Sequence, residues 1–235
     1  MIFGGWRGIL FGDEESTRVV PCEVSMADPV KTAFLVSALW FATASASADD
    51  SYFPIKTNVG GEGVTAFESK WYGKSLERMN EPRLPELVKD VKADVYRILI
   101  LPTWGNSIVV RVQRRGESYN LSARRLDGQA GYDPGKLVEA RDLELDMDDS
   151  KTLATLIQNL NFFRLPSEDD VRGEDGEAWI IEGVSQGKYH VATRWCAASY
   201  DPEKRKLTAF LALCRFLLDK STLSERPKNE GHKLI

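Results

Sequence analysis

A stretch near the end of the chain, DGEAWIIEGVSQGKYHVATRW (residues 175–195), restricts the possible folds more than any other part of the sequence. In the middle of it, Gln186-Gly187 suits a two-residue hairpin loop, because the glycine tolerates a positive φ. β-Branched and aromatic residues lie on both sides of this turn, as is typical of paired strands. The stretch therefore predicts an antiparallel β-hairpin.

The position of the turn determines which residues face each other across the hairpin. With a two-residue loop, Gly183 lies opposite His190 and Trp179 opposite Arg194, and we expect a cation–π contact of about 0.5–1 kcal/mol in the second pair. Glu182 then lies on the other side of the hairpin. A shift by one residue would instead place Glu182 opposite His190 as an acid–base pair, and the sequence leaves this second register open.

The rest of the chain supplies further strands and helices. Runs rich in β-branched residues predict strands over residues 96–101, 107–113, 119–126 and, less clearly, 136–146. Apolar residues at helical spacing predict three helices, with these inward-facing positions: Phe67, Trp71, Leu76 and Met79; Leu153, Leu156, Ile157, Leu160 and Phe163; Leu207, Phe210, Leu211, Cys214, Leu217 and Leu218. We expect Asp148 or Asp149 to cap the middle helix and Pro166 to end it.

These elements define the expected fold class. With 43% apolar and 28% charged residues, the chain can bury the core of one compact domain. The element order is a short helix, three or four strands, a helix, the hairpin and a last helix. It predicts an α+β fold, in which two main helices pack on one face of an antiparallel sheet of about five to six strands.

The N-terminal part has the layout of a secretory signal peptide. Lys31 precedes an apolar run that ends in small residues at Ala48, and the run is too short for a typical membrane-spanning helix. We expect cleavage near Ala48, export to the periplasm or the extracellular space, and no stable membrane insertion afterwards. An uncleaved anchor or a buried helix remains an alternative.

The signal peptide also sets the other boundaries along the chain. Residues 26–48 form it, and residues 1–25 are expected to be a non-native upstream extension. Residues 49–66 are predicted to be a linker, 67–224 a single α+β domain and 225–235 a polar tail.

Two cysteines remain after the signal segment, Cys196 and Cys214. In an oxidising compartment they are candidates for a disulfide, which would stabilise the fold by about 3 kcal/mol in the chain-entropy model. The alternative is that Cys214 is a small core residue and Cys196 a free thiol near the surface.

Charge and residue types exclude several functions. A net charge of −4 leaves no excess of positive charge for binding nucleic acid. Only His190 and His232 are present as histidines, so no zinc site is expected, and there is no Walker loop, dinucleotide fingerprint or serine-nucleophile elbow. Residues 168–177 gather carboxylates that could hold Ca²⁺, but a turn before the hairpin explains them better. We therefore expect no metal and no cofactor.

Five segments of the chain carry a resemblance to a known family. They are WYGKSLERMNEP (71–82), YRILILPTW (96–104), LDGQAGYDPGKL (126–137), NFFRLP (161–166) and the hairpin stretch. In this order they resemble a family of small uncharacterised bacterial proteins. The resemblance covers residues 67–223 and implies a shared domain but no particular activity.

Two functions from different classes remain. The first is an exported binding or interaction module of the bacterial cell envelope, which would contact a protein, a peptide or an envelope glycan through aromatic side chains: Trp104, Trp179, Tyr189 and Trp195. The second is a hydrolase, with Glu182 and His190 as acid–base groups and Arg194 as the anchor for an anionic substrate. Because no complete catalytic motif is present, we favour the first.

Overall fold

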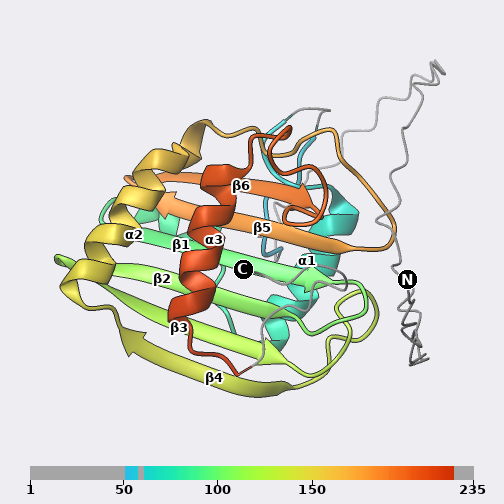
Figure 1. Ribbon diagram of the computed structural model, residues 1–235, viewed down its shortest axis with the longest axis horizontal. Helices are drawn as coiled ribbons and strands as arrows, with labels where there is room; N and C mark the ends of the chain where they lie inside the picture. Colours follow the sequence, from blue (N-terminus) through green and yellow to red (C-terminus); the bar gives the residue numbers. More distant parts are fainter. Residues whose placement is uncertain (1–50, 58–60, 225–235) are drawn as a thin grey trace, which may run out of the picture.

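The computed structural model describes residues 51–57 and 61–224 and confirms the α+β class. The predictions for residues 1–48 and 225–235 lie outside this described part. The sheet is antiparallel, in the order β4-β3-β2-β1-β5-β6 (Figure 1). Its strands are β1 (Asp94–Pro102), β2 (Ile108–Arg115), β3 (Ser118–Leu126), β4 (Leu137–Glu144), β5 (Glu177–Ser185) and β6 (Lys188–Trp195).

Helices cover both faces of this sheet. As predicted, two of them, α2 and α3, pack on one face, whereas α1 lies behind the sheet on the other (Figure 1). The helical segments are α1 (Ala66–Arg78), η1 (Leu84–Lys89), α2 (Met147–Leu160), η2 (Phe162–Arg164) and α3 (Thr208–Lys220).

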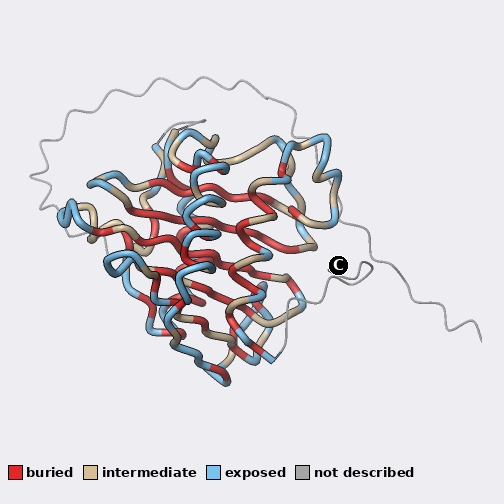
Figure 2. The backbone as a smooth tube through the Cα atoms, turned by 60° about the vertical axis from the view of Figure 1, so that its left-hand side comes forward, coloured by how far each residue is buried: buried red, intermediate tan, exposed pale blue. Residues whose placement is uncertain are grey.

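The central strand β1 shows why both faces need a cover. Ile98 and Ile100 point into the core formed with α2 and α3, whereas Leu99 and Leu101 point into the core formed with α1. A strand buried on both faces has a continuous apolar sequence rather than an alternating one. Figure 2 shows the same result as a band of buried residues through the middle of the sheet.

Helix α1 packs on the sheet through most of its predicted apolar face. A capping box between Thr65 and Glu68 begins the helix, and Tyr72, Leu76 and Met79 are buried. Phe67 was predicted to face the domain, but 74% of its surface is exposed. The prediction is wrong at this position because Phe67 lies in the first turn, where the helix reaches past the edge of the core.

Helix α2 is capped two or three residues earlier than predicted. Asp146, not Asp148 or Asp149, is its N-cap, and its side chain accepts a hydrogen bond from the Asp149 backbone N–H at 2.7 Å. The helix ends at Leu160 because Asn161 adopts a left-handed conformation, before Pro166 is reached.

The described parts of the predicted linker are ordered against the domain. Phe53 and Val64 are each only 1% exposed and pack with α1, and a β-bridge joins Ile55 to Val64. The linker prediction is wrong here, because these apolar side chains complete the core on the α1 face.

The predicted disulfide between Cys196 and Cys214 is also wrong. Cys214 is a free thiol on the inner face of α3, and it is buried in the core with the sheet. Burial raises the pKa of this thiol. Cys214 therefore acts as a small apolar core residue.

The outermost strand β4 is interrupted by a β-bulge. The register of its pairing shifts between Arg125 and Leu126 of β3, so that Val138 of β4 has no partner of its own and is 48% exposed. Charged residues Glu139 and Arg141 follow along the strand. In the part of the chain that the structure describes, no helix has the length and apolar character needed to cross a membrane.

Candidate functional site

The hairpin has the predicted two-residue turn, which separates two of the three candidate catalytic residues. Gln186 and Gly187 both have positive φ, 52° and 71°, and Gly183 lies opposite His190. The register with Glu182 opposite His190 is therefore wrong. Glu182 points to the α1 face of the sheet and His190 to the face covered by α2 and α3, so they form no acid–base pair.

Glu182 belongs to a buried network of charges that runs across the sheet. Its carboxylate accepts hydrogen bonds from Arg97 Nε at 3.1 Å and from the Tyr189 hydroxyl at 3.0 Å. Arg97 also donates to Glu81 Oε2 at 3.3 Å, and Arg111 donates to the same oxygen at 2.9 Å. Because each carboxylate is paired inside the protein, the network is structural.

His190 is buried beside an aromatic ring. Only 5% of its surface is exposed, and its ring centroid lies 5.1 Å from that of Phe162 in a T-shaped arrangement. Burial lowers the pKa of His190, although a hydrogen bond with the Leu165 backbone and the negative charge of Glu62 oppose this effect. His190 thus favours its neutral form in the folded protein.

The lowered pKa of His190 predicts a loss of stability in mild acid. Below about pH 6.5 the unfolded chain binds a proton that the native protein binds only at lower pH, so stability falls by up to about 1.4 kcal/mol per pH unit until the native pKa is reached. Replacing His190 by Leu should remove this part of the pH dependence. Urea unfolding of both proteins between pH 5 and 8 measures it, and identical pH profiles would contradict the prediction.

Arg194 is also committed to contacts within the protein. Its guanidinium donates to the backbone oxygens of Thr193 at 2.7 Å and Pro166 at 3.0 Å, and lies 5.7 Å from the ring centroid of Phe210. Trp179 does lie opposite Arg194 in the register, but the cation–π contact is made with Phe210 on α3. The arginine therefore fixes α3 and the loop after α2 to β6.

The four aromatic residues proposed for binding divide into two groups. Trp179 is fully buried, and Tyr189 donates its hydroxyl hydrogen to Glu182 inside the domain. Trp104 is 55% exposed, and Trp195 is partly exposed at the end of β6. Trp104 and Trp195 lie at the same end of the sheet, whereas Tyr189, which is also partly exposed, lies at the hairpin-turn end and has its hydroxyl bound to Glu182.

Trp104 and Trp195 lie among further aromatic side chains at one end of the sheet, where β1, β3 and β6 end. We call this group the aromatic end; it consists of Phe67, Trp71, Trp104, Tyr132 and Trp195. Ring centroids are 6.1 Å apart for Phe67 and Trp71, 6.3 Å for Trp71 and Trp195, and 5.0 Å for Trp104 and Tyr132. The Trp71 indole N–H donates to the Ala130 carbonyl at 2.7 Å, which joins α1 to the loop that carries Tyr132.

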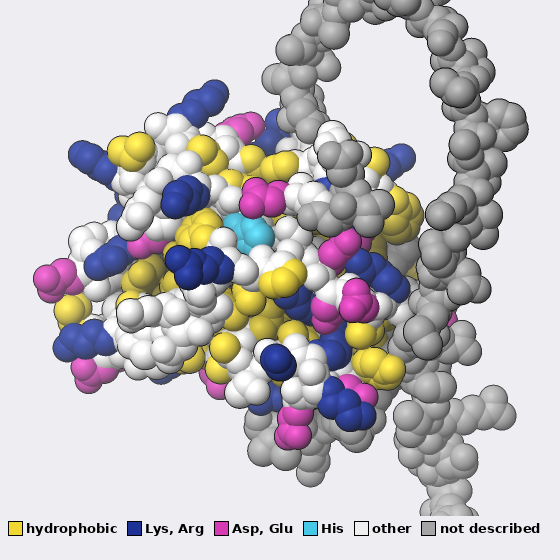
Figure 3. All heavy atoms as spheres, turned by 90° about the horizontal axis from the view of Figure 1, so that it is seen from above, with side chains coloured by type: hydrophobic (Ala, Val, Ile, Leu, Met, Phe, Trp, Pro, Cys, Tyr) yellow, Lys and Arg dark blue, Asp and Glu magenta, His cyan; other side chains and the backbone are white. Residues whose placement is uncertain are grey.

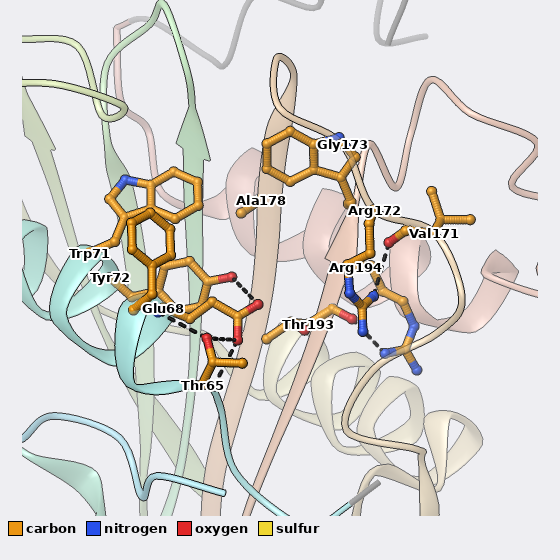
Figure 4. A pocket seen from close by; sticks show the side chains of 12 residues that line it. Thr65, Glu68, Trp71, Tyr72, Val171, Arg172, Gly173, Ala178, Thr193 and Arg194 are labelled. Atoms are coloured by element: carbon orange, nitrogen blue, oxygen red, sulfur yellow. Dashed lines mark hydrogen bonds between the residues drawn. The ribbon is translucent and has the colours of Figure 1, made fainter. Parts of the chain in front are cut away.

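A pocket of about 250 Å³ opens beside the aromatic end. Thr65, Glu68, Trp71 and Tyr72 of the α1 segment line one side, and the loop before β5, with Arg172, lines the other (Figure 4). Its lining consists of Thr65, Phe67, Glu68, Trp71, Tyr72, Val171, Arg172, Gly173, Ala178, Thr193, Arg194 and Trp195. The pocket therefore combines aromatic rings with a few polar groups, which is typical of ligand sites.

Sequence reasoning missed Phe67 and Tyr132 as surface residues and Trp71 as a residue of the pocket. Phe67 and Trp71 are four residues apart, and this spacing indicated a core-facing stripe. Tyr132 lies in a loop rich in glycine and proline, which alone would have suggested exposure. Nothing in the sequence indicates that these loops meet at one end of the sheet.

The acidic stretch at residues 168–177 holds ion pairs. Glu168 Oε2 lies 2.6 Å from Lys56 Nζ and 2.6 Å from Arg172, and Asp169 Oδ2 lies 2.8 Å from Arg205. Within residues 51–57 and 61–224, no three His, Cys, Asp or Glu side chains gather in a way that could hold a metal ion. These carboxylates therefore fix the loop before β5 to its neighbours.

The fold and the site define this chain as an α+β domain with an aromatic pocket at one end of its sheet. No protein-family model matches the chain, and no curated protein sequence matches it significantly. The resemblance to a family of small bacterial proteins therefore remains a prediction from the motifs.

Proposed function

We propose that this protein is an exported binding module of the bacterial cell envelope, which contacts its partner through the aromatic end. The observation that carries the proposal is the exposure of three aromatic side chains there: Phe67 is 74% exposed, Trp104 55% and Tyr132 57%. Large aromatic side chains are usually buried, and a group of exposed ones is typical of an interaction site.

The positions of the charged residues support binding rather than catalysis. Glu182 and His190 lie on opposite faces of the sheet, and Arg194 is held by backbone oxygens. Where the molecule is seen from above, positive and negative side chains are mixed with hydrophobic ones (Figure 3). On the face seen there neither sign of charge dominates, so it offers no charged patch that would attract a partner by charge.

The proposed location rests on the sequence. Residues 26–48 have the layout of a cleaved signal peptide, which would deliver the domain to the periplasm or the extracellular space. After export, the module would meet components of the cell envelope, and we therefore propose a partner there.

Sedimentation with isolated bacterial cell envelopes tests the proposal. The purified protein should sediment with the envelopes, and replacing Phe67 and Trp104 together by Ala should weaken this binding at least tenfold, because exposed aromatic anchors contribute most of the affinity. Val91→Ala is the matched control: Val91 is 72% exposed but precedes β1, at the opposite end of the sheet. Absence of binding, or equal binding by the double variant, would contradict the proposal.

A further inference from the structure

The charged side chains of the pocket are already paired within the protein. Glu68 accepts hydrogen bonds from the Thr65 N–H and hydroxyl, both at 2.8 Å, and from the Tyr72 hydroxyl at 3.3 Å. Arg172 lies 2.6 Å from Glu168, and Arg194 is bound as described above. Since none of these charges needs a counter-ion from outside, the pocket favours a neutral ligand.

One donor in the pocket is not paired. The indole Nε1 of Trp195 is buried and has no hydrogen-bond partner in the described part of the chain. A buried donor without an acceptor costs free energy, and a ligand that brings an acceptor removes this cost. A ligand with an oxygen acceptor is therefore expected to gain from turning the Trp195 indole N–H toward the pocket.

Three aromatic rings that line the pocket, those of Phe67, Trp71 and Trp195, form what we call the aromatic wall, and they restrict the shape of the ligand. The rings of Trp71 and Trp195 are tilted by 54°, and those of Phe67 and Trp71 by 41°, so they are not stacked face to face on one another. Ring faces left open in this way suit a flat group with apolar C–H bonds. A volume of about 250 Å³ is just below the range of about 300–1,000 Å³ for sites of drug-sized ligands, which leaves room for one such ring.

The edge of β6 beside the pocket argues against a peptide that binds as an added strand. The Thr193 N–H points away from β5 and donates to the Ser167 carbonyl at 2.7 Å, so the chain's own loop occupies this part of the edge. Strand addition needs such backbone groups to be unpaired.

From these observations we propose that the pocket binds one neutral sugar ring of an envelope glycan, with its C–H face against the aromatic wall and a hydroxyl or acetamido oxygen accepting from Trp195 Nε1. The inference rests on the proposed function and names the ligand class of the same site. Sugar rings have the properties that these observations require of a ligand. They are neutral and flat, they are apolar on one face, and they carry many hydrogen-bond acceptors.

Titration of the ¹⁵N-labelled protein with soluble oligosaccharides tests the inference. Chitotetraose and cellotetraose serve as neutral probes, and tetragalacturonate is the charged comparison. We expect at least one neutral probe to shift the indole N–H resonance of Trp195, and the charged probe to bind at least tenfold more weakly. Trp195→Phe removes the N–H and should weaken neutral binding about fivefold, the effect of one net hydrogen bond.

Val91→Ala is the control, because Val91 is 72% exposed but lies at the opposite end of the sheet, away from the pocket; its effect should stay below twofold. If Trp195→Phe does not fold, the shift of the Trp195 indole N–H resonance in the native protein still tests whether the neutral probe binds at this residue. Stronger binding of the charged probe would overturn the inference. So would the absence of sugar binding by a protein that still sediments with envelopes, and in that case the proposed function stands. If neither sugars nor envelopes are bound, both proposals fail.

Discussion

Replacing Arg97 by Met is expected to lower the free energy of unfolding by about 3–5 kcal/mol. The Arg97 side chain is 1% exposed and is the cation between two buried carboxylates, Glu81 and Glu182. Without it, Glu182 keeps only the hydrogen bond from Tyr189 and stays buried as an unpaired charge. Urea unfolding of the variant and the native protein at pH 7 measures the loss.

Two further variants separate this effect from a general loss of charge. Arg114→Met is the control, since that side chain is 50% exposed and 3.7 Å from Asp94, and its removal should cost less than about 1 kcal/mol. Adding Glu182→Leu to Arg97→Met should recover part of the lost stability, because the unpaired carboxylate is then absent. If Arg97→Met costs no more than Arg114→Met, the network does not stabilise the sheet as described.

Replacing Trp179 by Ala is expected to cost about 3–5 kcal/mol as well, for a different reason. Trp179 is fully buried in the core between the sheet and α3, so the change removes apolar contacts and leaves a cavity. Thermal and urea unfolding measure the loss.

Trp104→Ala is the corresponding exposed substitution. Because Trp104 is 55% exposed, its removal should change stability by no more than about 0.5 kcal/mol while weakening envelope binding. If Trp104 contributed as much to stability as Trp179, its ring would belong to the core, and the aromatic end would lose its interpretation as a contact surface.

Local patterns in the sequence predicted the fold well because they act over short distances. The Gln186-Gly187 turn predicted the observed register of the hairpin, although a shift by one residue stayed open, and the element order predicted both main helices on one face of the sheet. Local patterns could not predict that Glu182 pairs with Arg97. Arg97 lies 85 residues earlier, and only the pairing of β1 with β5 brings the two side chains together.

The candidate site was less predictable than the fold for the same reason. Its aromatic residues come from α1, from two loops and from the end of β6, and each has a local explanation as a core or turn residue. Of the four proposed binding residues, Trp104 and Trp195 lie at the candidate site, whereas Trp179 is fully buried and Tyr189, although partly exposed, lies at the hairpin-turn end. Burial of a side chain depends on which helix covers it, and a single sequence gives little information on that.

The bulge in β4 has a consequence for how the protein behaves at high concentration. An outermost strand with a regular row of free N–H and C=O groups is a template on which other chains can add and form fibrils. In β4 the extra residue Val138 breaks that row, and the exposed charges of Arg141 and Asp142 make a dry contact with another strand costly. The interruption thus protects the β4 edge from pairing with the strand of another chain.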